Sequence, residues 1–591
     1  MKNNEYDEIN NFVYKIGWSS LSMNLNPIND IGVKKLAVIT NESNINFYDG
    51  IKKYINSKYP KFNLIWLIIG DVCQKKSDSV YIINLYDQSN LNSIILSKKV
   101  TDIVLVYNKD STVINYDPYI VINSIWEQTK ILINLLDALP NEYVPRVTVI
   151  TEAASPIFMN NSLPSLVQST LWSAGRVIKL EFSEIDLKFI DLKFFNDIDF
   201  ATITEEIFYT RNIDVVSIDG SNKYIPRLIK YIQHPYPCPI DIKHKTFLVT
   251  GGTGALGLII AEWLATNGAK DILLIARTHP DIKTQNKLQD IRKFGANVKL
   301  YHIDISDESS VDNLFNILES EGYILNNIIH AAGVIHDVTY RNLTIEDLKK
   351  VLLPKVIGIV NIYTNLKKRN ITTDKLIMFS SATSIIGNLG QMNYAIANAF
   401  LDNFSYVLNN EGINTTSINW GVWNNTGMSG QSIAKSNLES SGFKRINKNE
   451  GLKVLDYVLR SQNLPQIGVI PMDWRLFLSK YKLKEIEYYK NVHLDDNIIP
   501  QHSNICNNFS STSGVNELKL MVKSSISEAL GTDVDDISDT TNLIALGMDS
   551  LSAVSLKHAI YKITKVNLSL NHLYQFKDFQ EMLEYIAKEV Q

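Results

Sequence analysis

The chain has few cysteines, no excess of basic charge and no long apolar run. Its 591 residues include three cysteines, Cys73, Cys238 and Cys506, which lie far apart without the spacing of metal ligands. They indicate neither a disulfide framework nor a zinc site, and they fit a reducing compartment. The 58 Lys and Arg residues are balanced by 62 Asp and Glu residues, for a formal net charge of -4. Such a chain has no basic surface of the kind that binds nucleic acid.

Signals for membrane insertion or export are also missing. The N-terminus, MKNNEYDEINN, is polar and acidic, unlike the basic and then apolar order of a signal peptide. Apolar runs such as residues 62–70 are too short to span a bilayer. We therefore expect a cytoplasmic protein with no membrane partner and no metal.

Alternating apolar and helix-like segments fill most of the chain and predict several α/β units. In the first 240 residues the predicted strands are 36–40, 63–70, 102–107 and 146–151, and none opens onto a glycine-rich turn. A second series begins at Thr246, with predicted strands 246–250, 271–276, 298–304, 327–333, 375–381 and 415–421.

The C-terminal part has a different pattern. Residues 502–514 (HSNICNNFSSTSG) are rich in Ser and Asn and are typical of a linker. Residues 515–591 show helical periodicity and predict a small helical bundle. The predicted boundaries are 1–240, 241–480, a flexible linker at 481–514, and 515–591.

A glycine-rich turn, residues 250–257 (TGGTGALG), follows the predicted strand 246–250 and precedes an apolar helix. Glycines at such a turn allow a tight bend and close approach to a pyrophosphate at the helix N-terminus. The alternative is an ordinary turn between a strand and a helix. The flanking segments favour a nucleotide site.

Two polar residues follow the next predicted strands. Arg277 ends the second strand, where an NAD site usually presents an acid to the ribose, so arginine favours the 2′-phosphate of NADPH. The alternative is a solvated surface arginine. Asp304 follows the third strand and is either an adenine contact or a strand-end cap.

Four residues fit the reduction of a carbonyl group. A carbonyl that accepts hydride develops negative charge on oxygen, so it needs a proton donor and hydrogen-bond donors. Tyr394 and Ser381 are the candidates for these roles, and Lys355 is a cation available to lower the phenol pKa. Asn398 is a candidate for ordering a water that supplies protons.

Together these segments resemble the ketoreductases of modular polyketide synthases and animal-type fatty acid synthases, a branch of the short-chain dehydrogenase/reductase family. The resemblance rests on TGGTGALG at 250–257, HAAGV at 330–334, PKVIG at 354–358, FSSATSIIGNLGQMNYAIANAFLD at 379–402, NWGVW at 419–423 and PMDW at 471–474. Segments 14–18, 166–184 and 224–231 are similar to the structural subdomain of this family. That subdomain resembles a nucleotide fold without the phosphate turn, so we expect no second cofactor site.

The resemblance implies roles for individual residues. Tyr394 is the proton donor and Ser381, thirteen residues before it, is preferred to Ser380; Lys355 and Asn398 exchange the places they have in ordinary short-chain reductases. The implied cofactor is NADPH, bound by Thr250, Gly252, Thr253, Gly254, Leu256, Gly257, Arg277, Asp304, Ala331, Ala332 and Gly333.

The resemblance also bears on stereochemistry and on a lid. Asp337 stands where an Asp marks the type of enzyme that gives an R (D) hydroxyl, and Asn393 agrees. His336 departs from the commoner neighbouring Asp, and Leu389 stands where Pro is frequent. Residues 424–443 are the expected lid over the substrate.

Residues 543–560 (LIALGMDSLSAVSLKHAI) resemble the signature of an acyl carrier, in which the Ser of DSL receives 4′-phosphopantetheine. Ser550 is that serine. The alternative for Asp549 and Ser550 is a simple helix cap. The implied fold is two Rossmann-like doubly wound parallel-sheet subdomains, one structural and one catalytic, followed by a small helical carrier bundle.

The sequence thus predicts an NADPH-dependent reductase that converts a β-ketoacyl thioester on its own carrier arm to a β-hydroxyacyl thioester, in polyketide or fatty acid biosynthesis. The expected partners are a phosphopantetheinyl transferase and ketosynthase and acyltransferase modules, in trans or on a longer chain. Two alternatives stay open: a catalytically silent reductase-like scaffold with an active carrier, and a dehydrogenase for a free small alcohol.

Overall fold

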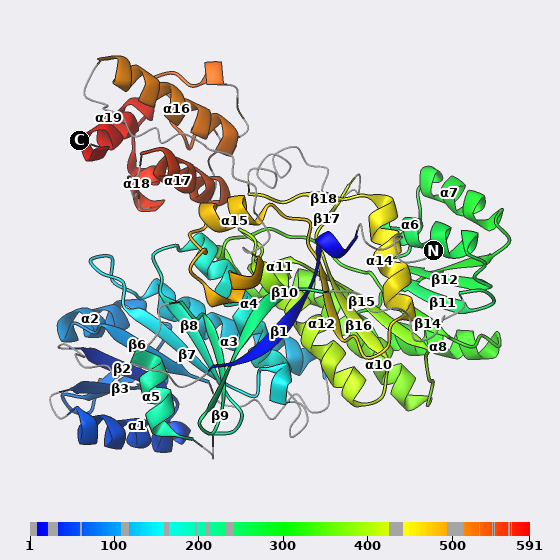
Figure 1. Cartoon of the computed structure of the whole chain (residues 1–591), viewed down its shortest axis with the longest axis horizontal. Helices are drawn as coiled ribbons and strands as arrows, with labels where there is room; N and C mark the ends of the chain where they lie inside the picture. The colour runs from blue at the N-terminus through cyan, green and yellow to red at the C-terminus, as the bar shows by residue number, and fades with distance from the viewer. Residues whose placement is uncertain are drawn as a thin grey trace. The chain divides into compact units, whose positions relative to one another are not determined.

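The computed structural model (Figure 1) describes residues 9–21, 34–59, 62–107, 117–158, 165–195, 198–208, 212–231, 242–424, 441–492 and 512–590, apart from residues 531, 533, 547, 549, 565, 567 and 569. The chain divides into two compact units. The first comprises residues 1–423, 446–471 and 485–491, and the second comprises residues 424–445, 472–484 and 492–591.

The first unit begins with an α/β half built on seven parallel strands and one short antiparallel strand. Its strands are β2 (Lys35–Thr40), β3 (Asn63–Ile69), β4 (Gln74–Lys75), β5 (Val80–Ile83), β6 (Asp102–Val106), β7 (Arg146–Glu152), β8 (Leu187–Leu192) and β9 (Val215–Asp219). Its helices are α1 (Ile45–Lys58), α2 (Gln88–Lys98), α3 (Pro118–Asp137), α4 (Leu166–Glu181) and α5 (Phe200–Phe208), with short η1 (Ile9–Asn11), η2 (Glu42–Asn44) and η4 (Pro156–Phe158). The parallel order is β5-β3-β2-β6-β7-β8-β9, and β4 pairs antiparallel with β5.

A second α/β half repeats this arrangement. Its strands are β11 (Thr246–Thr250), β12 (Asp271–Ala276), β13 (Asn297–His302), β14 (Asn327–His330), β15 (Lys375–Ser381), β16 (Thr415–Trp420) and β19 (Gln466–Val469), with short β17 (Val422–Trp423) and β18 (Arg445–Ile446). Its helices are α6 (Ala255–Thr266), α7 (Ile282–Arg292), α8 (Glu308–Ser320), α9 (Ile345–Leu352), α10 (Gly358–Lys368), α11 (Thr383–Ile386), α12 (Met392–Asn410) and α14 (Lys448–Arg460), with η5 (Tyr340–Asn342), the π-helical turn η6 (Leu353–Ile357) and η8 (Glu487–Val492). The parallel order is β13-β12-β11-β14-β15-β16-β19.

Both sheets carry helices on both faces, because the strand side chains that point to either face are apolar. In β2, Leu36 and Val38 pack with α1 and α5, whereas Ala37 and Ile39 pack with α3 and α4. Successive side chains of a strand point to opposite faces, and a parallel sheet covered on both faces reads as a continuous apolar run. The predicted doubly wound class is therefore confirmed, and each predicted strand corresponds to an observed one.

Two antiparallel strands join the halves into one seventeen-stranded sheet. Strand β10 (Asn222–Lys230) pairs with β9 of the first half, β1 (Val13–Leu21) pairs with β10, and the start of β1 pairs with β19 of the second half. The register of β1 and β10 runs from Tyr14 opposite Lys230 to Leu21 opposite Lys223. The sequence did not predict this join, because strand pairing is a property of the folded chain.

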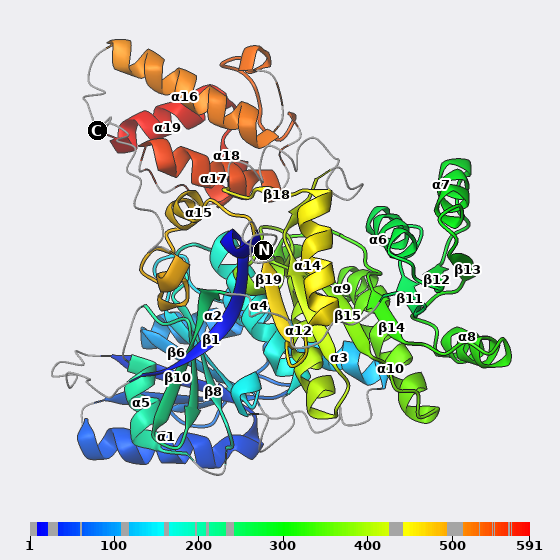
Figure 2. The same cartoon turned by 45° about the vertical axis from the view of Figure 1, so that its right-hand side comes forward.

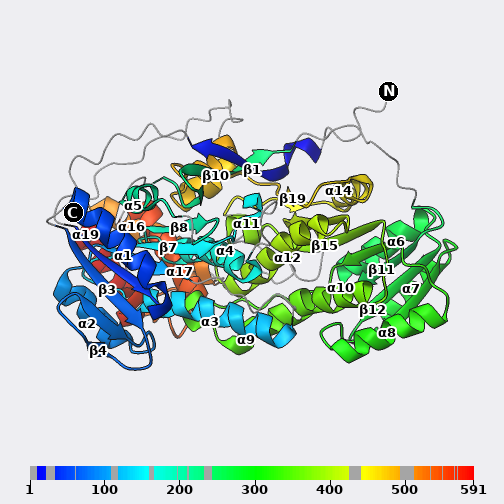
Figure 3. The same ribbon diagram turned by 90° about the horizontal axis from the view of Figure 1, so that it is seen from below.

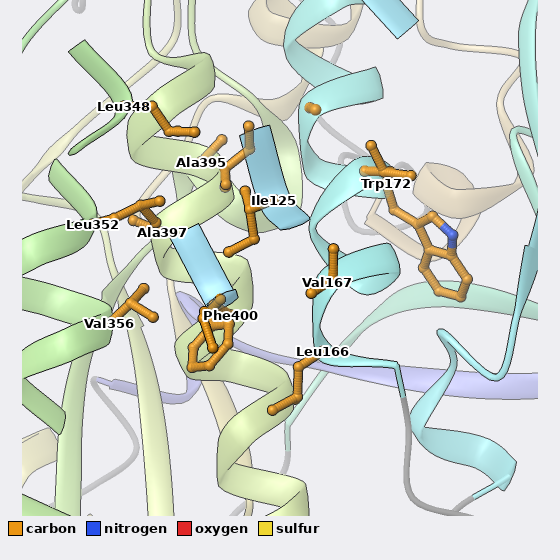
Figure 4. Close-up of a cluster of buried hydrophobic side chains, with 14 of the residues drawn as sticks. Ile125, Leu166, Val167, Trp172, Leu348, Leu352, Val356, Ala395, Ala397 and Phe400 are labelled. Atoms are coloured by element: carbon orange, nitrogen blue, oxygen red, sulfur yellow. The ribbon is translucent and has the colours of Figure 1, made fainter. Parts of the chain in front are cut away.

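Helices also pack across the boundary between the halves. Figure 3 shows α4 beside α12 and α3 beside α9. In Figure 4 the side chains of Ile125 and Val167 face those of Leu352, Ala397 and Phe400, and all five are buried in one apolar cluster. Burial of several large side chains in a single cluster couples the two halves mechanically.

The second unit holds the C-terminal helices (Figure 2). They are α15 (Trp474–Lys480), α16 (Thr512–Leu530), η9 (Val534–Asp536), α17 (Ser550–Thr564), α18 (Leu570–Gln575) and α19 (Phe579–Val590). Helices α16, α17 and α19 share a core that includes Val522, Leu556, Ile560 and Ile586. This core confirms the predicted helical bundle.

One predicted boundary differs from the structure. The sequence predicts a linker at 481–514, but residues 485–491, which include most of η8, lie in the first unit, and Tyr488 and Tyr489 are 1% and 3% exposed. Arg176 of α4 lies 4.6 Å from the ring centroid of Tyr488. The physical reason is that two aromatic rings bury too much apolar area to remain in a solvated linker. Residues 493–511 of the predicted linker lie outside the described residues.

Candidate active site

The glycine turn after β11 is built so that only glycine fits at its close approaches. Gly251 has φ 68°, in the left-handed region. A Cβ at Gly252 would lie 2.6 Å from Cβ of Leu274, and a Cβ at Gly257 would lie 2.3 Å from the backbone oxygen of Gly251. Gly254 is the N-cap residue of α6, and no side-chain hydrogen bond caps the helix there. The residues present fit a pyrophosphate at this helix N-terminus.

The edge of the sheet beyond β12 and β13 carries the two predicted adenosine-side residues. Arg277 follows β12 and is exposed. Oδ1 of Asp304 accepts hydrogen bonds from the Ser306 N–H (2.9 Å) and hydroxyl (2.6 Å). That geometry is the strand-end cap which the sequence left as an alternative, and an adenine contact for Asp304 stays a prediction. The rings of His279 and His302 also lie on this edge, with centroids 3.9 Å apart and planes tilted by 39°, and the sequence does not predict this contact.

The HAAG segment after β14 links the glycine turn to Lys355. The Ala332 N–H donates to Oγ1 of Thr250 at 3.1 Å, and a Cβ at Gly333 would lie 2.8 Å from Cε of Lys355. Gly333 therefore leaves the space that the lysine side chain occupies. These contacts bring Thr250, Ala332, Gly333 and Lys355 together as the sequence predicted.

A buried histidine in the same segment was missed. His330 Nε2 lies 2.8 Å from the carbonyl of Lys355, and Nδ1 lies 3.0 Å from Oγ1 of Thr250. Because the carbonyl only accepts, Nε2 carries the proton and Nδ1 accepts from the threonine hydroxyl. Burial lowers the pKa of His330 to about 3, so the ring is neutral. Its two hydrogen bonds connect Thr250 to the backbone of Lys355. Its place in HAAGV was the available signal.

The proton-transfer candidates come from three elements. Ser381 is the last residue of β15, Tyr394 and Asn398 lie one turn apart on α12, and Lys355 lies on η6. The Nζ of Lys355 is 5.3 Å from the centroid of the Tyr394 ring and donates to the carbonyl of Phe379 at 2.7 Å. A π-helical turn of this kind often marks a functional site.

Asn398 is held by one end and open at the other. Its Nδ2 donates to the carbonyl of Tyr394 at 2.7 Å. Its Oδ1 is buried and has no hydrogen-bond partner among the described residues. A buried acceptor normally finds a partner, so this oxygen fits the predicted role of holding a water.

Ser381 connects to the start of α12 through hydroxyl groups. Its Oγ donates to Oγ1 of Thr383 at 3.2 Å, and Oγ1 of Thr383 donates to Oε1 of Gln391 at 3.2 Å. Ser380 instead donates to the carbonyl of Asn398 and accepts from Asn419. Ser380 is 4% exposed, whereas Ser381 is partly exposed, which supports the choice of Ser381 as the substrate contact.

Burial dominates the titration of the central pair. Burial raises the pKa of Tyr394 to about 12, opposed by the hydrogen bond with Asn398. Burial lowers the pKa of Lys355 to about 7, opposed by the charge of Asp402. The expected lowering of the phenol pKa by Lys355 is thus absent from this arrangement, because burial of the phenol dominates and the lysine Nζ donates to the Phe379 carbonyl.

Asp402, four residues after Asn398 on α12, is the second group that the sequence missed. Its carboxylate accepts from the hydroxyls of Ser384 and Ser417 at 2.6 Å each and from Nδ2 of Asn419 at 2.7 Å. This buried network ties α12 to α11 and β16, and so fixes the helix that bears Tyr394.

The predicted stereochemical residue, Asp337, lies between β14 and η5 and contacts Gln391, the residue that precedes α12. Oδ1 of Asp337 accepts from Nε2 of Gln391 at 3.0 Å. Nδ2 of Asn393 donates to the carbonyl of His336 at 2.8 Å, and the His336 ring contacts Asp347 at 2.7 Å. Where the family more often has Asp, His336 thus has a polar partner in Asp347. The predicted lid falls mostly on residues 425–440, outside the described residues.

In the second unit, Ser550 is the first residue of α17. A helix start exposes N–H groups that tolerate a phosphate. Asp549 lies outside the described residues. Among the described helices, none combines the length and apolarity needed to cross a membrane.

Comparisons with known proteins identify two domains in the chain. The KR domain profile matches residues 245–425, and the phosphopantetheine attachment site profile matches residues 522–586. The chain is 26% identical over 486 residues to a 6-methylsalicylic acid synthase of Aspergillus niger, covering 76% of this chain and 26% of that protein. It is 25% identical over 445 residues to polyketide synthase GfsA of Streptomyces halstedii, covering 72% of this chain and 6% of that protein.

A solved structure described as A-type ketoreductases from a modular polyketide synthase shares the fold. Its TM-score is 0.68 at 20% identity, and the match covers 82% of this chain and 98% of that chain. Of the two curated relatives above, the chain spans only about a quarter of the length of the first and 6% of the length of the second. The chain holds a KR domain followed by a phosphopantetheine attachment site, and this pair is similar to a region of polyketide synthases. A KR domain implies use of NADPH.

Proposed function

We propose that this chain reduces a β-ketoacyl thioester, carried on a phosphopantetheine arm at Ser550, to the β-hydroxyacyl thioester. The observation that carries the proposal is the convergence around Tyr394: Lys355 Nζ lies 5.3 Å from its ring centroid, and Gly333, in the segment beside the glycine turn, leaves room for that lysine. NADPH supplies the hydride when bound. Thr250, the glycine turn and Ala331–Gly333 would hold it, and Arg277 favours its 2′-phosphate.

The protein residues then manage charge and protons. As the carbonyl carbon gains hydride, its C–O π bond breaks and the oxygen takes a proton from the Tyr394 hydroxyl. The Ser381 hydroxyl turns from Thr383 to donate to that oxygen. A water on Oδ1 of Asn398, with Lys355, returns a proton to the phenolate. Reduction thus leaves Tyr394 neutral, as its raised pKa requires.

The arm raises the local concentration of substrate at the site. A tethered thioester needs only weak recognition by the reductase, since its binding to the reductase site is intramolecular. We further propose R configuration from Asp337, a phosphopantetheinyl transferase as partner, and condensation by ketosynthase and acyltransferase modules in trans or on a longer chain. A cytoplasmic location also stays a prediction.

The reductase is tested with purified chain, NADPH and an acetoacetyl thioester, by loss of NADPH absorbance and chiral analysis of the alcohol. Tyr394→Phe should lower kcat by about 100-fold or more, the usual contribution of a general acid. Tyr406→Phe, on the same helix, should keep full activity; its hydroxyl only reaches Gln466 at 3.4 Å. Equal activity of wild type and Tyr394→Phe would contradict the mechanism, and an inactive wild type would favour a silent scaffold.

The carrier is tested separately by intact mass. Treatment with a phosphopantetheinyl transferase and coenzyme A should add one phosphopantetheine to wild type and none to Ser550→Ala. Unmodified wild type would favour a dehydrogenase for a free alcohol.

A further inference from the structure

A buried carboxylate of the first half reaches into the second. Glu181 is the last residue of α4 and is 5% exposed. Its Oε2 accepts from the Tyr340 N–H at 2.8 Å, and its Oε1 accepts from the Gly390 N–H at 2.9 Å. Both donors are backbone groups of the reductase half, so one side chain fastens two loops at once.

These two loops are paired with each other and present polar groups near the substrate side. The Val338 N–H donates to the carbonyl of Gly390 at 2.7 Å, and Gln391 donates to Asp337 at 3.0 Å. Gly390 has φ 71°, which favours glycine and allows its N–H to turn toward Glu181. Glu181 therefore sits behind the pair formed by Asp337 and Gln391.

The same contacts continue to the serine of the site. Gln391 accepts from Thr383, and Thr383 accepts from Ser381. A shift of the Gly390 loop would move Gln391 and release the hydroxyl pair. The path from Glu181 to Ser381 thus consists of a hydrogen bond to Gly390, the peptide bond from Gly390 to Gln391, and hydrogen bonds from Gln391 through Thr383 to Ser381.

A carboxylate is a costly choice for packing alone. Burial raises the pKa of Glu181 to about 7, opposed by the two N–H groups and by Arg341. The charged and titratable groups that face it are Arg341 and Tyr340. An apolar side chain would fill this position without the desolvation cost but would leave two buried N–H groups unpaired. The carboxylate answers a need for two acceptors at fixed positions.

We propose that Glu181 is a positioning residue for the substrate side of the reductase, which sets the orientation of the acyl group by fixing the Tyr340 and Gly390 loops. The half without a glycine turn therefore takes part in substrate selection. This inference rests on the proposed function and extends it.

The test compares Glu181→Gln with a matched variant. The amide oxygen of Gln accepts from one N–H, while its amino group faces the other. Asp191→Asn is the control: Asp191 is fully buried in the first half, accepts from the N–H groups of Ala154 and Ser155 at 2.9 Å, and burial raises its pKa to about 7 as well. Its contacts stay within the first half.

Four measurements separate a positioning role of Glu181 from a merely structural one. In Glu181→Gln, hydrogen exchange should accelerate in peptides covering residues 337–341 and 388–392, the KM for the acetoacetyl thioester should rise about tenfold, and the enantiomeric excess of the alcohol should fall. The NADPH Kd, from fluorescence titration, should change by less than about twofold. Asp191→Asn should keep the wild-type KM, enantiomeric excess and exchange in these peptides.

The outcomes are distinct. Unchanged exchange, or unchanged KM and enantiomeric excess, overturns the inference. Equal losses in both variants, or an equal loss of NADPH affinity, indicate a merely structural carboxylate and also overturn it. A wild-type chain that reduces no thioester refutes the proposed function instead, and the exchange measurement then decides the positioning role.

Discussion

The two α/β halves have the same strand order, yet their first strands end differently. In the second half, β11 runs into the glycine turn, residues 251–257. Close contacts in this turn leave no room for a Cβ at Gly252 or Gly257. In the first half, β2 runs into Asn41-Glu42-Ser43-Asn44, and the short helix η2 replaces the glycine turn. An acidic residue in this place would repel a pyrophosphate. A few residues at one strand end thus separate a nucleotide fold that fits a cofactor from one that does not.

The same contrast recurs on the fifth and sixth strands of each half. Asp191 pairs with Thr151 in the first half as Asn419 pairs with Ser380 in the second. Asp191 closes its strand ends by accepting from Thr151, Ala154 and Ser155. Asn419 instead donates to the serine and to Asp402, and Ser381 stays partly exposed. The carboxylate of Asp191 thus pairs with backbone N–H groups at the strand ends of the first half, whereas Asn419 pairs with side chains and the neighbouring Ser381 stays partly exposed.

The largest expected effect is a loss of kcat on replacement of Lys355, compared with replacement of a second buried lysine of the same half. Lys355→Met should lower kcat by about 100-fold or more, because the site loses the cation beside Tyr394. Lys375→Met is the matched control: Lys375 is also buried, but it donates to Asn414 and to the carbonyl of Ser461 at the opposite end of β15. It should keep normal kcat. Steady-state NADPH oxidation measures both, and equal losses would mean that burial alone matters.

The same pair gives a pH prediction for stability. Burial lowers the pKa of both lysines from 10.5 to about 7. Between these values the unfolded chain binds more protons than the folded chain, so each lysine makes stability rise with pH over this window. Both Met variants should lose part of that rise in urea unfolding at pH 7 and pH 10. A variant whose stability difference from wild type is the same at both pH values would contradict the assigned direction.

An exchange of the strand-six residues tests the second contrast. Asn419→Asp would place a second carboxylate against buried Asp402, and should cost about 2–4 kcal/mol of unfolding free energy. Asp191→Asn loses one acceptor for N–H groups and should cost less, about 1–2 kcal/mol. Urea unfolding of both variants checks the order. The reverse order would show that the first half depends more on its carboxylate than the second does on its amide.

Local patterns were enough to predict the elements. The short runs at 246–250 and 271–276 are mostly apolar and buried on both faces, and such runs are a strand signal. The pairing of β1 with β10 and β19 was beyond the sequence, because residues 14–18 contact residues more than 200 positions away. Buried Tyr488 was missed for the same reason, since a partner such as Arg176 is distant in the chain.

The residues of the site fall into two groups, those that the sequence predicts and those that it does not. Thr250, Gly333, Lys355, Tyr394 and Asn398 come together as expected, because strand ends and helix spacing fix their directions. The supporting groups His330, Asp402 and Glu181 were not predicted, because a buried polar residue reveals its role only through its partners. The pKa of Tyr394 was expected to fall and rises instead, since desolvation depends on burial that a sequence does not specify.

The smallest expected effect separates the halves by their glycines. Gly257→Ala would place a Cβ 2.3 Å from the rigid backbone oxygen of Gly251, so the turn must open. We expect a cost of about 1–3 kcal/mol, part of it as a roughly tenfold weaker NADPH Kd. Gly50→Ala, on α1, would meet the Phe200 ring at 2.1 Å and should destabilise the first half similarly while leaving the NADPH Kd unchanged. Fluorescence titration of NADPH and urea unfolding of both variants measure this difference. The two halves share one sheet and one buried cluster, so weaker NADPH binding in Gly50→Ala would show that a packing change in the first half alters the nucleotide turn.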